Sequence, residues 1–494
     1  MTGCVWYTVS LSANPAIGTI GNLVTITGTV LQPPSSAISN CRVDITVSDG
    51  ILVAPTTGHV DTDQDGRFTP AVRRDTAGYL TLTARVSNPC GAGEIAETIS
   101  VWFDNPSATD DWPMFQHDIA HTGVSNVSLP ANLVEKWRLE LAGDSNGILW
   151  SSPVVMDGWV YVGTNNAQGT LYAVRTNGMD ARTRNLGSAI EGSASVSGGR
   201  VYIGTVNGTL HSVYAGDQQG HNVLDPDWTK TFPDESITGG VTVYNGAAYV
   251  GTAYSGNGRL HTLNLADQAE RSGSPAPTPY AVDYTTPGID ELFSGGARGY
   301  ISDSSCAVTA IRCDTGAQAW SPPGYWMPDS SSFYSSPTIY AGYILGGSSW
   351  GYVYRIVDAG SNYSLPSPVK YYTSGAVNST LAALSGKLYF GSLGGNFYCL
   401  NAAALTQVWS TGLGSPITCS ALISQPSGVI FVCTDGGILH ARSLTNGSYL
   451  WSYDFSTGIS DPTTKASLAA ADGKLFVVVG SNTNAGRRLY CFGP

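Results

Sequence analysis

A short sequence pattern recurs eight times between residue 156 and the C-terminus. In the three clearest copies a turn glycine precedes an aromatic and β-branched run that ends at Gly-Thr, followed by Gly-x-Leu-Tyr or Gly-x-Leu-His, and the other five copies are fainter. The runs end at Gly163, Gly204, Gly251, Ser302, Gly347, Gly391, Cys433 and Gly480, which lie 41 to 51 residues apart. Because a period of this length built from short strands is typical of propeller blades, the repeat predicts a β-propeller.

The last copy predicts how the propeller closes. It ends after a third strand over residues 488–492, so the outer strand of its blade is missing. Residues 133–141 include Trp137 and match the tryptophan-bearing ends of other repeats, so we expect them to supply that strand. Closure with strands from both chain ends removes the free edges of an open array. The predicted fold is an all-β, eight-bladed propeller, with seven blades as the alternative because the fourth copy is degenerate.

The N-terminal part of the chain has a different pattern. Apolar and polar residues alternate over 23–30, 42–47 and 79–86, among other short segments of residues 1–104. Strands at this spacing predict an immunoglobulin-like β-sandwich, and the polar, turn-rich residues 105–111 are expected to be a linker to a propeller over 112–494. The first domain resembles bacterial surface immunoglobulin-like modules, which space or display other domains.

A second resemblance covers residues 112–494. The segment Trp112-Pro-Met-Phe-Gln-His-Asp-Ile-Ala-His-Thr-Gly123 resembles the one that precedes propellers of the pyrroloquinoline-quinone-like repeat superfamily. The repeats also carry the Gly-x-Leu-Tyr-Ala feature and the Asp/Asn-Gly-x-x-x-Trp feature of that family, as at residues 314–320 and 445–451. The resemblance implies an eight-bladed propeller, and in the enzymes of the family it implies a quinone on the axis with calcium, a carboxylate base and a stacking tryptophan.

Composition limits the classes of partner. The net charge of −12 disfavours nucleic acid and anionic membrane surfaces, which attract basic proteins. Only 12% of the residues are charged, about half the usual share of a soluble protein, which favours a secreted or assembling protein. No apolar run is long enough to span a membrane, and no intact signal peptide is visible. Met1-Thr-Gly-Cys4 resembles a lipoprotein cleavage box, but we favour a plain N-terminal cysteine.

Nine cysteines make an odd set, so at least one is unpaired or bonds another chain. Cys41 and Cys90 are the disulfide candidates in the first domain. Cys419 and Cys433 begin and end adjacent strands, where a cross-strand bond and buried free thiols are both open. Five Asn-x-Ser/Thr sequons are candidates for glycosylation of an exported protein, at Asn126, Asn207, Asn362, Asn378 and Asn446.

Two segments have the spacing of metal ligands. Asp61, Asp63 and Asp65 precede Gly66 and present alternate carboxylates, as a calcium loop does, but Val72 stands where the bidentate acid is required. Asp-Gly between alternating strands is also a common hairpin turn, which we favour. His117 and His121 have the i, i+4 spacing of zinc ligands on a helix, but the family segment described above accounts for both.

One side chain in each repeat occupies the same register position. The set is Tyr172, His211, His261, Thr309, Tyr354, Tyr398, His440 and Tyr490. Because equivalent positions in a propeller are spread around a ring, the three histidines cannot converge on one metal. We expect these residues to pack between blades.

No nucleophile elbow, phosphate-binding loop or dinucleotide motif is present. We therefore expect a non-enzymatic extracellular or cell-surface scaffold or adhesion protein without a cofactor, which acts through protein contacts and self-associates, for example into a filament or surface layer. The first alternative is a quinone-dependent dehydrogenase, although the adjacent-cysteine disulfide of those enzymes has no counterpart here. The second is a factor resembling the lipoprotein propeller that assists outer-membrane assembly.

Overall fold

The computed structural model describes residues 8–14, 17–19, 24–32, 36–48, 50–73, 78–87, 94–104, 111–142, 149–216, 221–305, 307–321, 325–326, 332–360, 369–483 and 486–494. The chain divides into two compact units, residues 1–106 and 107–494. Within the described residues the secondary structure is β-strand, apart from one 3-10 turn, η1 (Phe455–Thr457). No described helix is long and apolar enough to cross a membrane.

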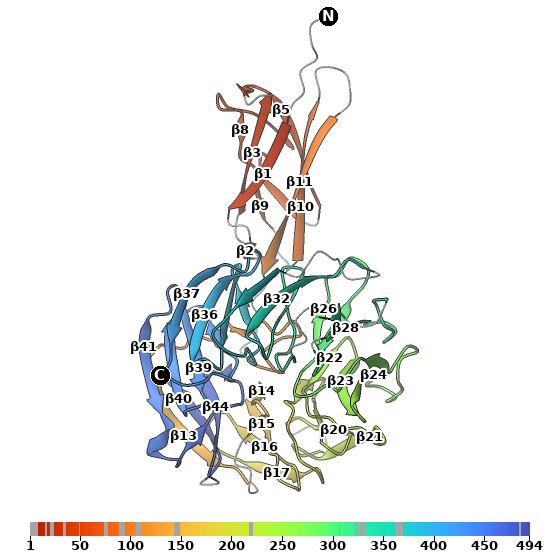
Figure 1. Ribbon diagram of the computed structural model, residues 1–494, viewed down its shortest axis with the longest axis vertical. Helices are drawn as coiled ribbons and strands as arrows, with labels where there is room; N and C mark the ends of the chain where they lie inside the picture. Colours follow the sequence, from red (N-terminus) through yellow and green to blue (C-terminus); the bar gives the residue numbers. More distant parts are fainter. Residues whose placement is uncertain are drawn as a thin grey trace, which may run out of the picture. The chain divides into compact units, whose positions relative to one another are not determined.

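The first unit consists of two sheets around one core (Figure 1). One sheet contains β1 (Thr8–Asn14), β3 (Val24–Gln32), β9 (Ala71–Arg73) and β6 (Ile51–Ala54), with β4 (Ser36–Ala37) and β8 (Arg67–Phe68) paired to β3. The other contains β2 (Ile17–Thr19), β11 (Glu94–Asp104), β10 (Gly78–Ser87), β5 (Arg42–Ser48) and β7 (His59–Asp61). Alternate residues such as Val24, Val43 and Leu80 are buried between the sheets, as the period-2 pattern requires. The immunoglobulin-like topology stays a prediction.

The second unit contains eight sheets among its described residues, and six of them are simple four-stranded meanders. The first two contain β14 (Val154–Met156), β15 (Trp159–Gly163), β16 (Thr170–Arg175) and β17 (Arg182–Asn185), and then β18 (Ser195–Ser197), β19 (Arg200–Gly204), β20 (Thr209–Tyr214) and β21 (Pro226–Thr231). The next two contain β22 (Val241–Tyr244), β23 (Ala247–Tyr254), β24 (Asn257–Asn264) and β25 (Ala276–Thr278), and then β26 (Gly288–Asp290), β27 (Arg298–Ser302), β28 (Ala307–Arg312) and β29 (Tyr325–Trp326). The last two contain β30 (Thr338–Tyr340), β31 (Tyr343–Gly347), β32 (Tyr352–Val357) and β33 (Val369–Tyr372), and then β34 (Ala382–Leu384), β35 (Lys387–Gly391), β36 (Asn396–Asn401) and β37 (Gln407–Gly412).

The other two sheets combine strands from both ends of this unit. β12 (Val124–Ser125) pairs in parallel with β38 (Leu422–Ser424), which continues to β39 (Val429–Thr434), β40 (Ile438–Ser443) and β41 (Tyr449–Asp454). β13 (Val134–Glu140) pairs antiparallel with β45 (Arg488–Gly493), next to β44 (Lys474–Ser481), which also pairs with β42 (Pro462–Thr463) and β43 (Ala469–Ala471). The segment over 133–141 thus lies against the last strand of the chain.

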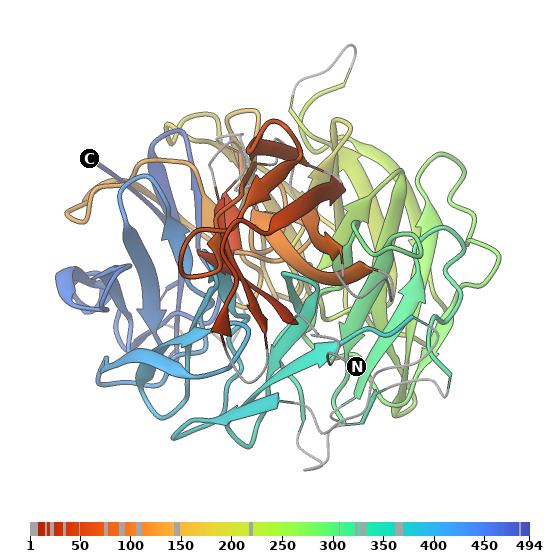
Figure 2. The same ribbon diagram turned by 90° about the horizontal axis from the view of Figure 1, so that it is seen from above.

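The sheets are arranged around a common centre, in the order of the chain (Figure 1). Figures 1 and 2 agree that the blue sheets of the last repeats lie opposite the green sheet β22–β25. The second strand of a sheet is buried on both faces, as in β15 with five buried residues, whereas the outermost strand β17 alternates. A strand between two packed neighbours requires continuous apolar residues, and an edge strand requires only one apolar face.

Candidate functional site

A ring of side-chain hydroxyls surrounds the centre of the second unit. In seven of the eight sheets, a residue one or two positions before the innermost strand donates its backbone N–H to a hydroxyl oxygen of the next sheet. The bonds run from Gly240 to Thr286 (3.2 Å), Thr286 to Ser336 (2.9 Å), Ser336 to Thr380 (3.1 Å), Thr380 to Ser420 (2.9 Å), Ser420 to Ser467 (3.2 Å), Ser467 to Ser152 (2.9 Å) and Ser152 to Ser193 (2.9 Å). We call these eight residues the hydroxyl tier.

One step of the tier has no such bond. Gly240 has no side chain to accept a hydrogen bond from Ser193, and at this point the N–H of Val241 instead donates to the Ser193 carbonyl oxygen at 3.2 Å. A Cβ atom on Gly240 would lie 2.5 Å from Thr286 Oγ1, so the close approach of the two sheets requires a glycine. The hydroxyl tier is therefore regular except between the second and third repeats.

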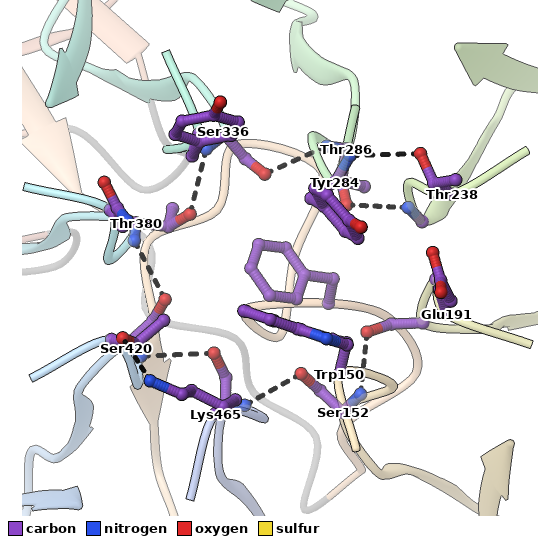
Figure 3. A pocket seen from close by; sticks show the side chains of 18 residues that line it. Trp150, Ser152, Glu191, Thr238, Tyr284, Thr286, Ser336, Thr380, Ser420 and Lys465 are labelled. Carbon is purple, nitrogen blue, oxygen red and sulfur yellow. Dashed lines mark hydrogen bonds between the residues drawn. The ribbon is translucent and has the colours of Figure 1, made fainter. Parts of the chain in front are cut away.

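The residue two positions before each member of the hydroxyl tier forms a second layer. In chain order this layer is Trp150, Glu191, Thr238, Tyr284, Tyr334, Asn378, Thr418 and Lys465. All eight line a cavity of about 310 Å³, together with the hydroxyl tier, Gly192 and Phe115. Figure 3 shows the hydrogen bonds around the perimeter, with Trp150 reaching toward the middle and Tyr284 on the side of Thr286. We call this layer the variable tier, because no two adjacent repeats except the fourth and fifth carry the same residue type.

Aromatic side chains dominate one part of the cavity. The ring centroids of Trp150 and Tyr284 lie 5.3 Å apart with an interplanar angle of 33°. Tyr284 and Tyr334 are 41% and 38% exposed, although they line a cavity at the centre of the unit. Phe115, from the segment before the repeats, is half-buried beside them. Large rings left open to solvent inside a cavity are typical of a ligand-binding site.

The two charged members of the variable tier have opposite surroundings. Lys465 forms an ion pair with Asp435, whose Oδ2 also accepts a hydrogen bond from Thr418 Oγ1 at 2.9 Å. Glu191 forms no ion pair with any residue that the structure describes. Burial, and then the nearby charge of Asp283, raise the pKa of Glu191, and burial also raises the pKa of Asp283. The cavity therefore carries an excess of negative charge on the Glu191 side.

Asn378 adds a polar atom without a partner. Its Oδ1 lines the same part of the unit, is inaccessible to solvent and accepts no hydrogen bond from the described residues. A buried acceptor left without a donor costs about 1–3 kcal/mol.

The calcium candidates lie far from this cavity in sequence, in the first unit. Asp61, Asp63 and Asp65 are exposed, and Asp63 to Gly66 form a turn. Asp63 Oδ1 accepts the backbone N–H groups of Asp65 and Arg67 at 2.9 and 2.8 Å, so the turn itself uses this oxygen. No group of three or more His, Cys, Asp or Glu side chains is placed to hold a metal ion within the described ranges.

His117 and His121 do not share a helical face. Their φ angles are 79° and 60°, both in the left-handed region, so the segment is a series of turns. His121 Nδ1 lies 2.8 Å from the carbonyl oxygen of Pro337, and burial lowers the pKa of His121 to about 4. This neutral, buried imidazole holds the segment against β30.

The cysteine and sequon candidates have varied positions. Cys90 and Asn362 lie outside the described residues, so a Cys41–Cys90 disulfide stays a prediction. Cys419 and Cys433 are free, buried thiols. Asn207 and Asn446 are exposed and Asn126 is half-buried, whereas Asn378 belongs to the cavity lining.

The side chains in the shared register position are all buried, as packing between sheets requires. The set is Tyr172, His211, His261, Thr309, Tyr354, Tyr398, His440 and Tyr490. Burial lowers the pKa values of His211 and His440 to about 4. His261 differs, because its Nε2 lies 2.8 Å from Glu235 Oε2 and its Nδ1 lies 3.1 Å from Glu270 Oε1.

The Glu235–His261–Glu270 group is a buried charge network. Burial alone would lower the pKa of His261, but the two carboxylates outweigh it and raise the pKa. Burial alone would raise the pKa of Glu235, yet hydrogen bonds from His261 and Thr252 lower it to about 2. Arg259 also pairs with Glu235. Every charge in this network has a partner, which distinguishes it from Glu191.

The fold and the cavity define a β-propeller with a lined axial pocket. Residues 307–489 match the model of a family described as outer membrane protein assembly factor BamB. No curated protein sequence matches the chain. Residues 307–489 thus match repeats of the pyrroloquinoline-quinone-like type.

Solved structures share this fold at low sequence identity. Quinohemoprotein alcohol dehydrogenase from Comamonas testosteroni has a TM-score of 0.62 and 15% identity, over 79% of this chain and 82% of that chain. A europium-containing methanol dehydrogenase has a TM-score of 0.59 and 14% identity, over 78% of this chain and 98% of that one. BamB from Moraxella catarrhalis has a TM-score of 0.54 and 14% identity, over 74% and 98%.

These similarities correct two expectations. The prediction of a non-enzymatic protein is wrong as an inference from the fold, because proteins with this fold include alcohol and methanol dehydrogenases. The prediction of no cofactor is wrong for the same reason, since those dehydrogenases are a quinohemoprotein and a europium-containing enzyme. Both expectations rested on the absence of a sequence motif. The axial pocket is formed by single residues that precede each inner strand, so no contiguous motif marks it.

Sequence reasoning missed the axial residues, although a signal was present. Ser/Thr pairs precede the inner strands at 151–152, 285–286, 335–336 and 379–380, and a proline follows three of them. These pairs recur with the same period as the glycine pattern. Aligning the repeats on these pairs would have identified the variable tier, which lies two positions before the second residue of each pair.

Proposed function

We propose that this chain is an exported, eight-bladed propeller that binds a small organic molecule in its axial pocket. The observation that carries the proposal is the pair of rings, Trp150 and Tyr284, left open to solvent inside a cavity of about 310 Å³. Eight equivalent positions in each tier support the blade number. A cavity of this volume suits a small ligand, and the ring faces offer it stacking surfaces.

The quinone that the family resemblance implies does not match the pocket. Pyrroloquinoline quinone carries three carboxylates, so its site requires cationic side chains or a metal held by several anionic ligands. Here Glu191 and the nearby Asp283 are acidic, and Lys465 is already paired with Asp435. The charged side chains of this pocket therefore do not fit pyrroloquinoline quinone.

The test is a ligand screen on the full-length protein. We expect at least one class of small polar or aromatic compound to raise the melting temperature, because a ligand at 100 times its dissociation constant adds about 2.7 kcal/mol of stability. The Trp150→Ala variant should not respond to the same compounds. If no compound stabilises the wild type more than Trp150→Ala, the proposed function is wrong.

A second candidate function is protein contact through the outer rim. Exposed apolar residues gather on the outermost strands of four successive sheets: Val369 and Tyr372 on β33, Val408 on β37, Tyr449 and Leu450 on β41, and Val134 on β13. We infer that this rim binds a second copy of the chain. Light scattering over a concentration series tests self-association, and Tyr372→Ser with Tyr449→Ser should abolish it. A monomer at all concentrations excludes the second copy.

A further inference from the structure

The variable tier indicates which chemical class of ligand the axial pocket takes. Its charged and aromatic members are not distributed evenly around the ring. In the closed ring Trp150 lies between Glu191 of the second repeat and Lys465 of the last, so the acid and the amine flank it on opposite sides (Figure 3). The inference below rests on the proposed function, since it specifies the ligand of the same pocket.

The acidic side of the pocket has no internal counter-charge. Glu191 is half-buried, and neither it nor Asp283 forms an ion pair with another residue that the structure describes. The one cationic member of the variable tier, Lys465, is neutralised by Asp435 and also donates to Thr418 Oγ1 at 3.4 Å. A half-buried carboxylate without a counter-ion is costly, and a cationic ligand would offset that cost.

The aromatic side chains are suited to the same charge. The face of an indole or phenol ring attracts a cation within about 6 Å of the ring centroid, and sites for ammonium groups combine several such faces. Trp150 and Tyr284 lie within 5.3 Å of each other, and Tyr334 and Phe115 line the same cavity. An ammonium group in this cavity would meet ring faces and a carboxylate together.

The hydroxyl tier supplies the complementary polar contacts. Each hydroxyl oxygen accepts a backbone N–H from the neighbouring sheet, which leaves its own hydrogen to be donated. The pocket can thus bind oxygen atoms of a ligand around its perimeter and still engage a cation at Glu191.

We propose that the axial pocket binds a small organic ammonium compound, with its cationic group between Glu191 and the faces of Trp150 and Tyr284. The negative charge of Glu191 and Asp283 excludes anionic ligands from this pocket. The polar end of the ligand, a hydroxyl or carbonyl group, lies toward the hydroxyl tier.

The experiment compares two probes of the same shape and different charge. Choline and its neutral isostere 3,3-dimethyl-1-butanol are titrated into the full-length protein by calorimetry. We expect choline to bind at least about tenfold more tightly than the neutral alcohol, because the ring faces and the Glu191 carboxylate attract only the charged group. Glu191→Gln should remove this preference, whereas the surface variant Asp314→Asn should keep it.

The outcomes separate the two proposals. If both probes bind equally and Trp150→Ala abolishes both, the pocket is a ligand site but the cationic class is wrong. If neither probe binds the wild type, the cationic class is also wrong, and the compound screen alone then decides the proposed function. If choline binds with full preference in Glu191→Gln, the role assigned to Glu191 is wrong. Melting temperatures of Glu191→Gln and Trp150→Phe show that a lost signal is not a lost fold.

Discussion

The two tiers of the axial pocket differ in what the repeat keeps constant. Seven of the eight residues in the hydroxyl tier are serine or threonine, and each hydroxyl joins two neighbouring sheets. Two residues earlier, the variable tier holds a tryptophan, an acid, two tyrosines, an amide, a lysine and two threonines. The constant layer closes the ring, and the variable layer determines what the ring can bind.

The same contrast appears between two carboxylates. Glu235 is 2% exposed and is paired with His261 and Arg259, which stabilises its charge. Glu191 faces the cavity and has a raised pKa. A paired charge contributes to stability, while an unpaired one is a cost that proteins retain at functional sites. The predictions below follow from this difference.

The largest effect is expected from Glu235→Gln. Removing Glu235 from this buried charge network leaves Arg259 without its carboxylate and His261 with Glu270 alone, so we expect a loss of about 3–5 kcal/mol of unfolding free energy. Urea denaturation at pH 6 measures this loss. A change below about 1 kcal/mol would show that the network is not stabilising.

The pH dependence of stability checks the same network. The pKa of Glu235 is lowered from 4.5 to about 2, so its contribution is present above pH 4.5 and is lost as the pH falls toward 2. The pKa of His261 is raised above 6.5, so its contribution is present below pH 6.5 and is lost as the pH rises through the folded value. Relative to Glu235→Gln, the wild type should gain most between about pH 4.5 and 6.5. A difference that does not vary with pH would contradict this.

Ser420→Ala removes one link of the hydroxyl tier. The backbone N–H of Thr380 would lose its acceptor in a buried position, which costs about 1–3 kcal/mol. Ser410→Ala, on an exposed outer strand, is the matched control and should change little. Equal effects of the two substitutions would show that the tier does not hold the sheets together.

Gly240→Ala tests the irregular step of the tier. The new methyl group would lie 2.5 Å from Thr286 Oγ1, so we expect a loss of about 1 kcal/mol as Thr286 shifts. Gly412→Ala is the control, since its nearest contact is 3.6 Å away. Unchanged unfolding of Gly240→Ala would show that the two sheets have room at this point.

The smallest expected effect has the opposite sign. Because burial and Asp283 disfavour the charged form of Glu191, replacement by glutamine should stabilise the protein at pH 7, by up to about 1 kcal/mol. Below pH 4.5 the gain should disappear, since the wild-type acid is then protonated in both states. A loss of stability in Glu191→Gln would identify the residue as structural.

The repeat pattern was enough to predict the propeller, because glycine turns and buried second strands are local features with a fixed period. Residues 133–141 could be assigned to a strand by their likeness to other repeat ends, and β13 lies against β45. The site was different. Glu191 is one of 36 acidic residues, and its neighbours in the pocket come from eight separate repeats. Only closure of the ring brings Trp150 and Tyr284 within 5.3 Å.

The histidines show the same limit. His211, His261 and His440 share one register position, but only His261 lies between two acids, and Glu235 comes from a loop outside the repeat pattern. His117 and His121 have zinc-like spacing, yet left-handed backbone angles separate their side chains. Spacing in sequence predicts convergence only where the local backbone is regular.

The most direct test of the axial site is a crystal structure of the full-length protein at saturating choline. We predict density for the trimethylammonium group within about 6 Å of the Trp150 ring centroid and in contact with the Glu191 carboxylate. Ordered water alone between Trp150, Tyr284 and Glu191, with choline absent or bound elsewhere on the surface, would contradict it.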